Sequence, residues 1–246
     1  MDDRLRLCHL YPDLLNLYGD RGNVLALKRR AQWRGMDLEI EQISMGEKFD
    51  EDRYDLIFLG GGQDAEQNII RTDFVSGKGD AVKRAVEKNK VFLCICGGYQ
   101  MMGTFYEEHD GTRIDCLGAI SVHTIGKENR FIGDTVYACP FLSGSKILYG
   151  FENHSGRTYL GSGVKPLAQV ISGAGNNGED GFEGAIYRNV YCTYSHGSFL
   201  PKNPRMTDHL LLCAGKEKWG EEFALADLSD EMEEFARSSL LTCKNA

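Results

Sequence analysis

Residues 91–100 read VFLCICGGYQ. This apolar, β-branched run ends at Cys96 and passes directly into a glycine pair, which predicts a buried strand that turns sharply into a helix. The residue at such a corner projects its side chain above the sheet, and the small residues after it let neighbouring backbone approach. Because the positive end of a helix favours a thiolate over a thiol, the pattern predicts that Cys96 is a nucleophile.

Two other interpretations of these cysteines stay open. Cysteine is often buried, and Cys94 fits the core of a central strand. A Cys-x-Cys pair also occurs in metal sites, but one pair supplies only two ligands, and no second pair follows to complete a tetrahedral site. The sequence therefore predicts no metal site. A thiol redox pair formed by Cys94 and Cys96 remains an alternative.

The surrounding pattern predicts an α/β fold with a mostly parallel central sheet flanked by helices. Strand patterns alternate with helical patterns, the strands at residues 5–10, 38–40 and 54–59 and the helices at 23–33 and 81–89. This alternation is typical of βαβ units. Active sites of such sheets lie at the carboxyl ends of the strands, where both Cys96 and the triple glycine at residues 60–62 fall.

The second half of the chain has a different sequence pattern. Between residues 117 and 194, short β-like runs alternate with loops rich in Gly, Ser and Asn, which predicts added, partly antiparallel strands, the first of them at residues 119–122. The C-terminal part is expected to be helical, most clearly at residues 221–240. No repeat or linker divides the chain, so we expect one domain over residues 1–246.

Composition excludes several classes of protein. The chain has 246 residues and a net charge of −8, which disfavours a nucleic-acid partner because phosphate binding needs clustered positive charge. No apolar run is long enough to span a membrane, and the acidic start does not resemble a secretory signal. The eight cysteines lack the close spacing of small disulfide-bonded domains. We therefore expect a cytoplasmic protein without a transmembrane segment.

A cysteine nucleophile needs a general base, and His196 is the first candidate among six histidines. It follows a strand pattern at residues 190–195. If this strand lies parallel to the one that ends at Cys96, the imidazole reaches the same edge of the sheet. His154 is the second candidate, although a lone histidine is more often a structural hydrogen-bonding residue.

Acyl transfer also needs donors for a developing oxyanion. The backbone N–H of Gly97 follows the nucleophile, and the triple glycine, with Gly62, can bring a second N–H close. A phosphate-binding loop is the alternative interpretation of the glycines, but no Lys-Ser or Lys-Thr follows in P-loop spacing. The sequence therefore predicts no ATP site and no cofactor in this chain.

The elbow at residues 96–100, the glycine loop at 60–64 and the distal His196 resemble a class I, triad-type glutamine amidotransferase of the cobyric-acid-synthase-like branch. Four segments narrow the resemblance to the glutaminase subunits of lipid II isoglutaminyl synthases, namely residues 10–23, 129–133, 150–158 and 196–204. The resemblance implies a flavodoxin-like three-layer sandwich.

The resemblance also implies that two subunits catalyse two successive reactions, a division of labour between a glutaminase and a ligase. The glutaminase subunit hydrolyses L-glutamine to glutamate and ammonia. A separate Mur-ligase-like subunit, which holds ATP and Mg²⁺, amidates the D-glutamate of the peptidoglycan stem in lipid II to D-isoglutamine. Two alternatives remain, an amidotransferase subunit for a corrinoid or other carboxylate acceptor and a non-catalytic scaffold.

By the family pattern, Cys96 attacks the glutamine amide and His196 takes the thiol proton. Arg130 occupies the position of the family's substrate-binding arginine, and its planar guanidinium suits the α-carboxylate of glutamine. Gln100 is a further candidate for contact with the substrate. The sequence departs from the pattern at Ser198, where many members carry an acid. Two alternatives follow: a Cys–His dyad suffices for catalysis, or a carboxylate of the partner subunit completes the triad. We expect the isolated chain to be a weak glutaminase.

Overall fold

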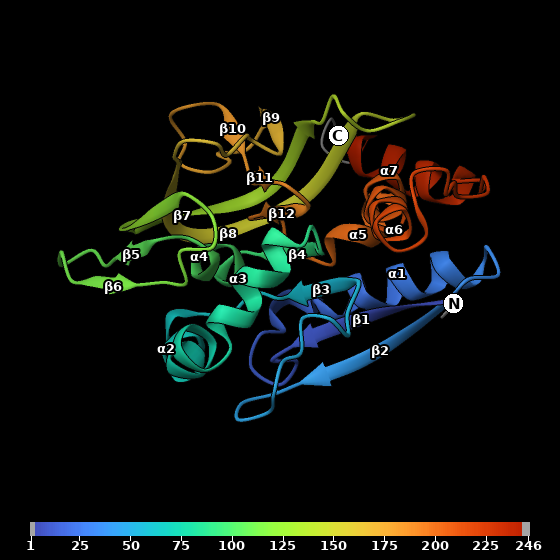
Figure 1. Cartoon of the computed structure of the whole chain (residues 1–246). Helices are drawn as coiled ribbons and strands as arrows, with labels where there is room; N and C mark the ends of the chain where they lie inside the picture. Colours follow the sequence, from blue (N-terminus) through green and yellow to red (C-terminus); the bar gives the residue numbers. More distant parts are fainter. Residues whose placement is uncertain (1–2, 243–246) are drawn as a thin grey trace.

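The structure, a computed structural model, describes residues 3–242, apart from the side chains of Asp64 and of residues 238–242. Its centre is a six-stranded sheet in the order β11-β12-β4-β3-β1-β2, parallel except for the pairing of β11 with β12. The strands are β1 (Arg4–Leu10), β2 (Asp37–Ile43), β3 (Leu56–Leu59), β4 (Val91–Ile95), β11 (Ala185–Tyr187) and β12 (Val190–Thr193). This confirms the predicted α/β fold with a mostly parallel sheet (Figure 1).

The three strands at the middle of this sheet are buried at every position. They are β3, β4 and β12. Strands covered on both faces read as continuous hydrophobic runs, which is why the sequence of β4 contains no alternating polar residues. Their burial fixes the register between neighbours, so the residues that follow each strand emerge at defined places along one edge.

Helices flank the sheet in two groups (Figure 1). Helix α1 packs with α5 and α6, while α2 packs with α4 and with the π-helical turn η2, which also contacts α3. The helices of the first half of the chain are η1 (Leu17–Gly19), α1 (Arg21–Gln32), α2 (Asp64–Thr72), η2 (Asp73–Gly77), α3 (Gly79–Glu87) and α4 (Gly97–Met102). Those of the second half are α5 (Phe199–Lys202), α6 (Pro204–Trp219) and α7 (Glu231–Thr242).

A second sheet contains the added strands in the order β10-β9-β7-β5-β6, and β8 pairs with β7. Its strands are β5 (Phe105–Glu107), β6 (Arg113–Asp115), β7 (Val122–Ala138), β8 (Ile147–Leu160), β9 (Ala168–Ser172) and β10 (Phe182–Glu183). Strands β7 and β8 form a long antiparallel pair, called the ribbon below (Figure 1). Its register changes between Gly126 and Phe131. A single bridge between Phe151 and His196 joins the ribbon to the segment after β12.

Two predicted elements are wrong in their extent. The strand expected at residues 119–122 begins only at Val122, where β7 starts. The helix expected at 221–240 begins at Glu231 instead. Residues 221–230 stay irregular because tertiary contacts hold them: Arg34 donates a hydrogen bond to the Ala226 carbonyl, and Arg30 binds the Asp230 carboxylate.

No helix within residues 3–242 has both the length and the apolar composition needed to cross a lipid bilayer.

Candidate active site

The turn from β4 into α4 places Cys96 in a rare backbone conformation. Its φ is 47° and its ψ is −101°, values that L-residues seldom adopt. The glycine pair allows this turn, because a Cβ on Gly98 would lie 2.6 Å from the carbonyl oxygen of Leu59. The predicted elbow is therefore present, with a cysteine at its corner that is 8% exposed.

The glycine loop lies directly against this elbow. Strand β3 pairs with β4, so residues 60–62 leave the sheet beside Cys96. The N–H of Gly98 donates a hydrogen bond of 3.2 Å to the Gly60 carbonyl. A Cβ on Gly97 would lie 2.9 Å from the backbone nitrogen of Gly62. The two predicted oxyanion donors are thus neighbours, and their role stays a prediction.

The structure brings the predicted side chains together in one cavity. Strand β12 runs parallel to β4, with Thr193 opposite Ile95, so His196 emerges at the same edge as the elbow. The cavity has a volume of about 160 Å³ and is called the catalytic pocket below. Its lining includes five residues singled out from the sequence: Gly62, Cys96, Gln100, Arg130 and His196.

His196 is fully buried, and its backbone N–H donates to the carbonyl of Phe151 at 2.8 Å. Neither ring nitrogen has a hydrogen-bond partner among the described residues. Burial, and secondarily the positive charge of Arg130, lowers the pKa of His196 to about 4. The imidazole is therefore neutral at pH 7 and able to accept a proton.

His154, the second candidate base, also lines the catalytic pocket. Its ring stacks on Tyr194, with 3.7 Å between the centroids and 8° between the planes. Its Nδ1 lies 2.8 Å from the carbonyl of Gly156, so Nδ1 carries the hydrogen and donates it. Burial lowers the pKa of His154 to about 3. These contacts fit a structural residue better than a base.

Arg130 reaches the catalytic pocket from the ribbon, just where β7 changes register. Its guanidinium donates to the side-chain oxygen and the carbonyl of Asn153, at 2.9 and 3.0 Å. Asn153 in turn donates to the hydroxyl of Tyr18 at 2.6 Å. The exposed guanidinium is thereby held at the mouth, where a carboxylate can approach from solvent.

Gln100 lies in the wall of the catalytic pocket with its amide already engaged. Its oxygen accepts a hydrogen bond from Gln67 at 3.1 Å, and its nitrogen donates to the Tyr194 hydroxyl at 3.2 Å. A substrate contact through Gln100 would replace one of these bonds. Gln67 also donates to the Gly62 carbonyl at 3.2 Å, so it supports the glycine loop from behind.

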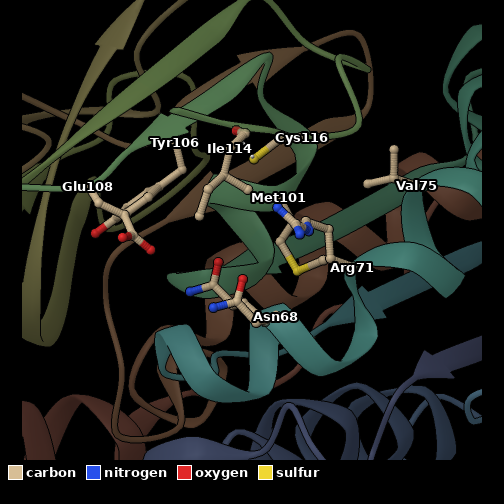
Figure 2. Close-up of a pocket in the computed structure, with 9 residues that line it drawn as sticks. Asn68, Arg71, Val75, Met101, Tyr106, Glu108, Ile114 and Cys116 are labelled. Carbon is tan, nitrogen blue, oxygen red and sulfur yellow. Dashed lines mark hydrogen bonds between the residues drawn. The ribbon is translucent and has the colours of Figure 1, made fainter. Parts of the chain in front are cut away.

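A second, smaller cavity of about 30 Å³ shares Gln67 with the catalytic pocket. It lies between α2 and the β5–β6 hairpin, and Figure 2 shows Asn68 and Arg71 on one side and Tyr106, Ile114 and Cys116 on the other. Met101 of α4 contributes to its lining. None of the predicted catalytic residues reaches it.

The sequence interpretation overlooked Asp20, which follows η1 and is fully buried. Its Oδ2 accepts the N–H of Gly61 at 2.6 Å, and its Oδ1 lies 4.0 Å from Nδ1 of His196. Burial raises the pKa of Asp20 to about 7, although the Gly61 hydrogen bond opposes this rise. An acid in the loop after β1 was a usable signal, because β1 pairs with β3 and ends at the same edge.

The pocket provides charged and polar groups for a small organic substrate. Within the described part of the chain, no three His, Cys, Asp or Glu side chains are grouped as ligands for a metal ion. The polar groups that reach the pocket include the Arg130 guanidinium, the Asn153 amide and the Ser155 residue beside His154. The predicted nucleophile, the predicted base and the two predicted backbone donors, together with the Arg130 cation, suit attack on an amide of an amino acid.

The sequence matches one family of known proteins over most of its length. The family model of the CobB/CobQ-like glutamine amidotransferase domain matches residues 6–204. The chain is 41% identical over 229 residues to the "Lipid II isoglutaminyl synthase (glutamine-hydrolyzing) subunit GatD" of Streptococcus pneumoniae, covering 92% of this chain and 86% of the relative. It is 39% identical to the protein of the same name from Staphylococcus aureus, covering 98% and 96%.

Solved structures share the fold at low sequence identity. A structure of PurLQS from Thermotoga maritima superimposes with a TM-score of 0.57 and 18% identity, covering 78% of this chain and 87% of that one. A glutamine amidotransferase from the same organism gives a TM-score of 0.55 and 16% identity, covering 96% and 93%. At such identities the likeness concerns the fold alone.

Proposed function

The chain belongs to the CobB/CobQ-like glutamine amidotransferases, and from this premise we propose that it is the glutaminase subunit of a lipid II isoglutaminyl synthase. It hydrolyses L-glutamine to glutamate and ammonia. The single observation that carries the chemistry is that Cys96 at its elbow and His196 after the neighbouring strand line one pocket. The similarity to two GatD subunits, at 41% and 39% identity, extends over nearly the full length of the chain. This similarity supports the assignment to lipid II amidation.

Catalysis begins with transfer of the Cys96 thiol proton to His196. The sulfur then forms a bond to the amide carbon of glutamine, and the carbonyl electrons move onto the oxygen. His196 returns the proton to the amide nitrogen as the carbon–nitrogen bond breaks, so that ammonia leaves and a thioester remains. Water, activated by His196, hydrolyses the thioester to glutamate and restores the thiol.

Two features of the pocket support transition-state stabilisation and substrate orientation. The backbone N–H groups of Gly62 and Gly97 stabilise the oxyanion, which carries its charge only during the reaction. Arg130 binds the α-carboxylate at the mouth of the pocket, and Gln100 helps to shape the wall against the substrate side chain. These assignments place the reacting amide beside Cys96 and the charged end of glutamine near solvent.

The ammonia is consumed by a second subunit. A Mur-ligase-like partner that holds ATP and Mg²⁺ activates the α-carboxyl of D-glutamate in the stem peptide of lipid II and amidates it to D-isoglutamine. This reaction takes place in the cytoplasm, where ATP and the lipid-linked precursor meet. The chain itself needs no cofactor for glutamine hydrolysis.

The proposal is tested by co-expressing the chain with a Mur-ligase-like subunit from the same genome. The purified complex is given glutamine, ATP, Mg²⁺ and lipid II, and both glutamate release and amidated lipid II are measured. We expect one amidated product for each glutamate released. Absence of glutamate release by the wild-type complex would support a non-catalytic scaffold instead. Amidation of a cobyrinic-type acceptor, but not of lipid II, would assign the chain to corrinoid synthesis.

A further inference from the structure

The segment between β1 and α1 places the buried carboxylate of Asp20 beside His196, the proposed general base. Asp20 is fully buried, and its two oxygens face different partners. Oδ2 accepts the N–H of Gly61 at 2.6 Å, while Oδ1 lies 4.0 Å from Nδ1 of His196. Neither Oδ1 nor Nδ1 has a hydrogen-bond partner among the described residues. A small rotation of the imidazole therefore closes a hydrogen bond that satisfies both atoms.

The chain around Asp20 is built to hold this position. The hydroxyl of Ser198 donates to the carbonyl of Gly19, and the side-chain oxygen of Asn23 accepts the N–H of Leu200 at 2.7 Å. The segment before Asp20 and the helix after it are thus both fastened to the segment that follows His196. By the family resemblance, residue 198 is a position where an acid is expected, and here its hydroxyl donates to Gly19 in the loop that carries Asp20.

The electrostatics of His196 require an anion close by. Transfer of the thiol proton creates an imidazolium, but burial and the charge of Arg130 lower the pKa of His196 to about 4. The other titratable groups that line the pocket with the ring are Tyr18, Cys96, Arg130 and His154, none of which is a carboxylate. Within the described residues, Asp20 is the carboxylate that lies within 4.0 Å of the ring. An anion there stabilises the imidazolium in a site of low dielectric.

We propose that Asp20 is the positioning residue that completes the catalytic triad from within this chain. The Nδ1–H of His196 donates to Oδ1 of Asp20, which directs Nε2 as the acceptor of the Cys96 proton. Burial raises the pKa of Asp20 to about 7, but the positive charge that forms on His196 favours the ionised carboxylate, so Asp20 acts as an anion and takes no proton from His196. Through Oδ2, the same carboxylate holds Gly61 and hence the glycine loop that supplies the Gly62 N–H.

This inference rests on the proposed glutaminase function, and Asp20→Asn tests it. The asparagine oxygen still accepts the Gly61 N–H, whereas its NH₂ group meets Nδ1 of His196 as a donor. In the complex with the ligase subunit, we expect kcat for glutamate release to fall by about 10²- to 10⁴-fold. KM for glutamine should change by less than about threefold, because Asp20 does not contact the substrate. Asp13→Asn changes an exposed carboxylate of the same loop and is the matched control.

A second measurement separates positioning from a purely structural effect. The rate at which iodoacetamide alkylates Cys96, followed on its own peptide by mass spectrometry, reports thiolate formation as a function of pH. We expect the midpoint to move to higher pH in Asp20→Asn, since the imidazolium beside the thiolate is weakened. If this variant does not fold, Ser198→Ala, which loosens the loop through Gly19, should shift the midpoint in the same direction by a smaller amount.

The outcomes are distinct from those that test the proposed function. A wild-type complex that releases no glutamate contradicts the function, whatever Asp20 does to the alkylation midpoint. An active wild type with unchanged kcat and midpoint in Asp20→Asn contradicts the role of Asp20. Full activity of Asp20→Asn in the complex, but not alone, would assign the third acid to the partner subunit and overturn the inference.

Discussion

The carboxyl edge of the parallel sheet and the antiparallel ribbon contribute different parts of one pocket. The parallel strands supply Cys96, His196 and residues 60–62 of the glycine loop, and all of these residues are buried. The ribbon supplies Arg130, whose guanidinium is exposed and bonded to Asn153. Under the proposed function, the buried edge positions the reacting groups, whereas the exposed guanidinium of the ribbon is available to a charged substrate that arrives from water. Substitutions at the edge should therefore change kcat, and substitutions in the ribbon should change KM.

The largest expected effect is a loss of glutamate release when Cys96, at the carboxyl edge of the parallel sheet, is replaced. Cys96→Ser should lower glutamate release by at least about 10⁴-fold, because a hydroxyl is far less readily ionised than a thiol. Amidation with added ammonium should continue in the complex, since the ligase subunit is intact. Both reactions are measured on the same preparation. Cys116→Ser, a half-buried cysteine in the second cavity, is the control. Loss of the ammonium-driven reaction in Cys96→Ser would contradict the division of labour.

The next largest expected effect is a rise in KM for glutamine when Arg130 of the ribbon is replaced. Arg130→Ala should raise KM for glutamine by about 10- to 100-fold and leave kcat within a few-fold, because a charge-assisted hydrogen bond contributes roughly 1.5 to 3 kcal/mol. Steady-state kinetics of glutamate release measure both constants. Arg188→Ala removes an arginine that pairs with Glu87 on the surface and should have no effect. A normal KM in Arg130→Ala would reduce Arg130 to a surface hydrogen-bonding residue.

A stability measurement compares how tightly the two regions are packed. A Cβ on Gly98 would meet backbone oxygens of residues 59 and 60, whereas a Cβ on Gly133 in the ribbon would meet no atom within 4 Å. Gly98→Ala should lower the free energy of unfolding by about 1 to 3 kcal/mol, and Gly133→Ala by less than about 0.5 kcal/mol. Urea denaturation gives both values. Equal losses would contradict the contrast between a tight edge and an open ribbon.

The smallest effect concerns pH and a histidine of the parallel sheet. Burial, with a smaller contribution from Arg21, lowers the pKa of His9 to about 4. The unfolded chain binds this proton near pH 6.5 and the folded chain does not, so stability present above pH 6.5 is lost as the pH falls toward 4. His9→Gln should reduce that loss by roughly 1 to 2 kcal/mol. Urea denaturation across this pH range measures it, and His123→Gln is the ribbon's control. A pH curve that the two substitutions alter equally would contradict the prediction.

The sequence predicted the parallel edge well because its signals are local. A continuous apolar run followed by glycines identifies β4 and its elbow, and the same pattern identifies β3 and the glycine loop. Since neighbouring parallel strands end at one edge, the placement of Cys96 and His196 in one pocket followed from topology. These signals need no knowledge of distant contacts.

The ribbon and the C-terminal region were predicted less completely, because distant contacts decide their structure. The exposed residues 127–130 interrupt any alternating pattern, and the length of β7 depends on its pairing with β8. Residues 221–230 have helix-forming composition, but the bond from Arg34 to the Ala226 carbonyl competes with helical hydrogen bonding. Asp20 was missed for a related reason, since its loop reads as turn residues and its contact with His196 joins distant parts of the chain.

The positive φ of Cys96 has a consequence for how this enzyme tolerates change. A left-handed backbone at a residue with a side chain is strained by about 1 kcal/mol or more, and glycine relieves that strain. Cys96→Gly should therefore yield a protein that is inactive and yet melts at a higher temperature than the parent. A screen for thermal stability alone would therefore tend to discard the proposed nucleophile, whereas a screen for glutamine hydrolysis would retain it.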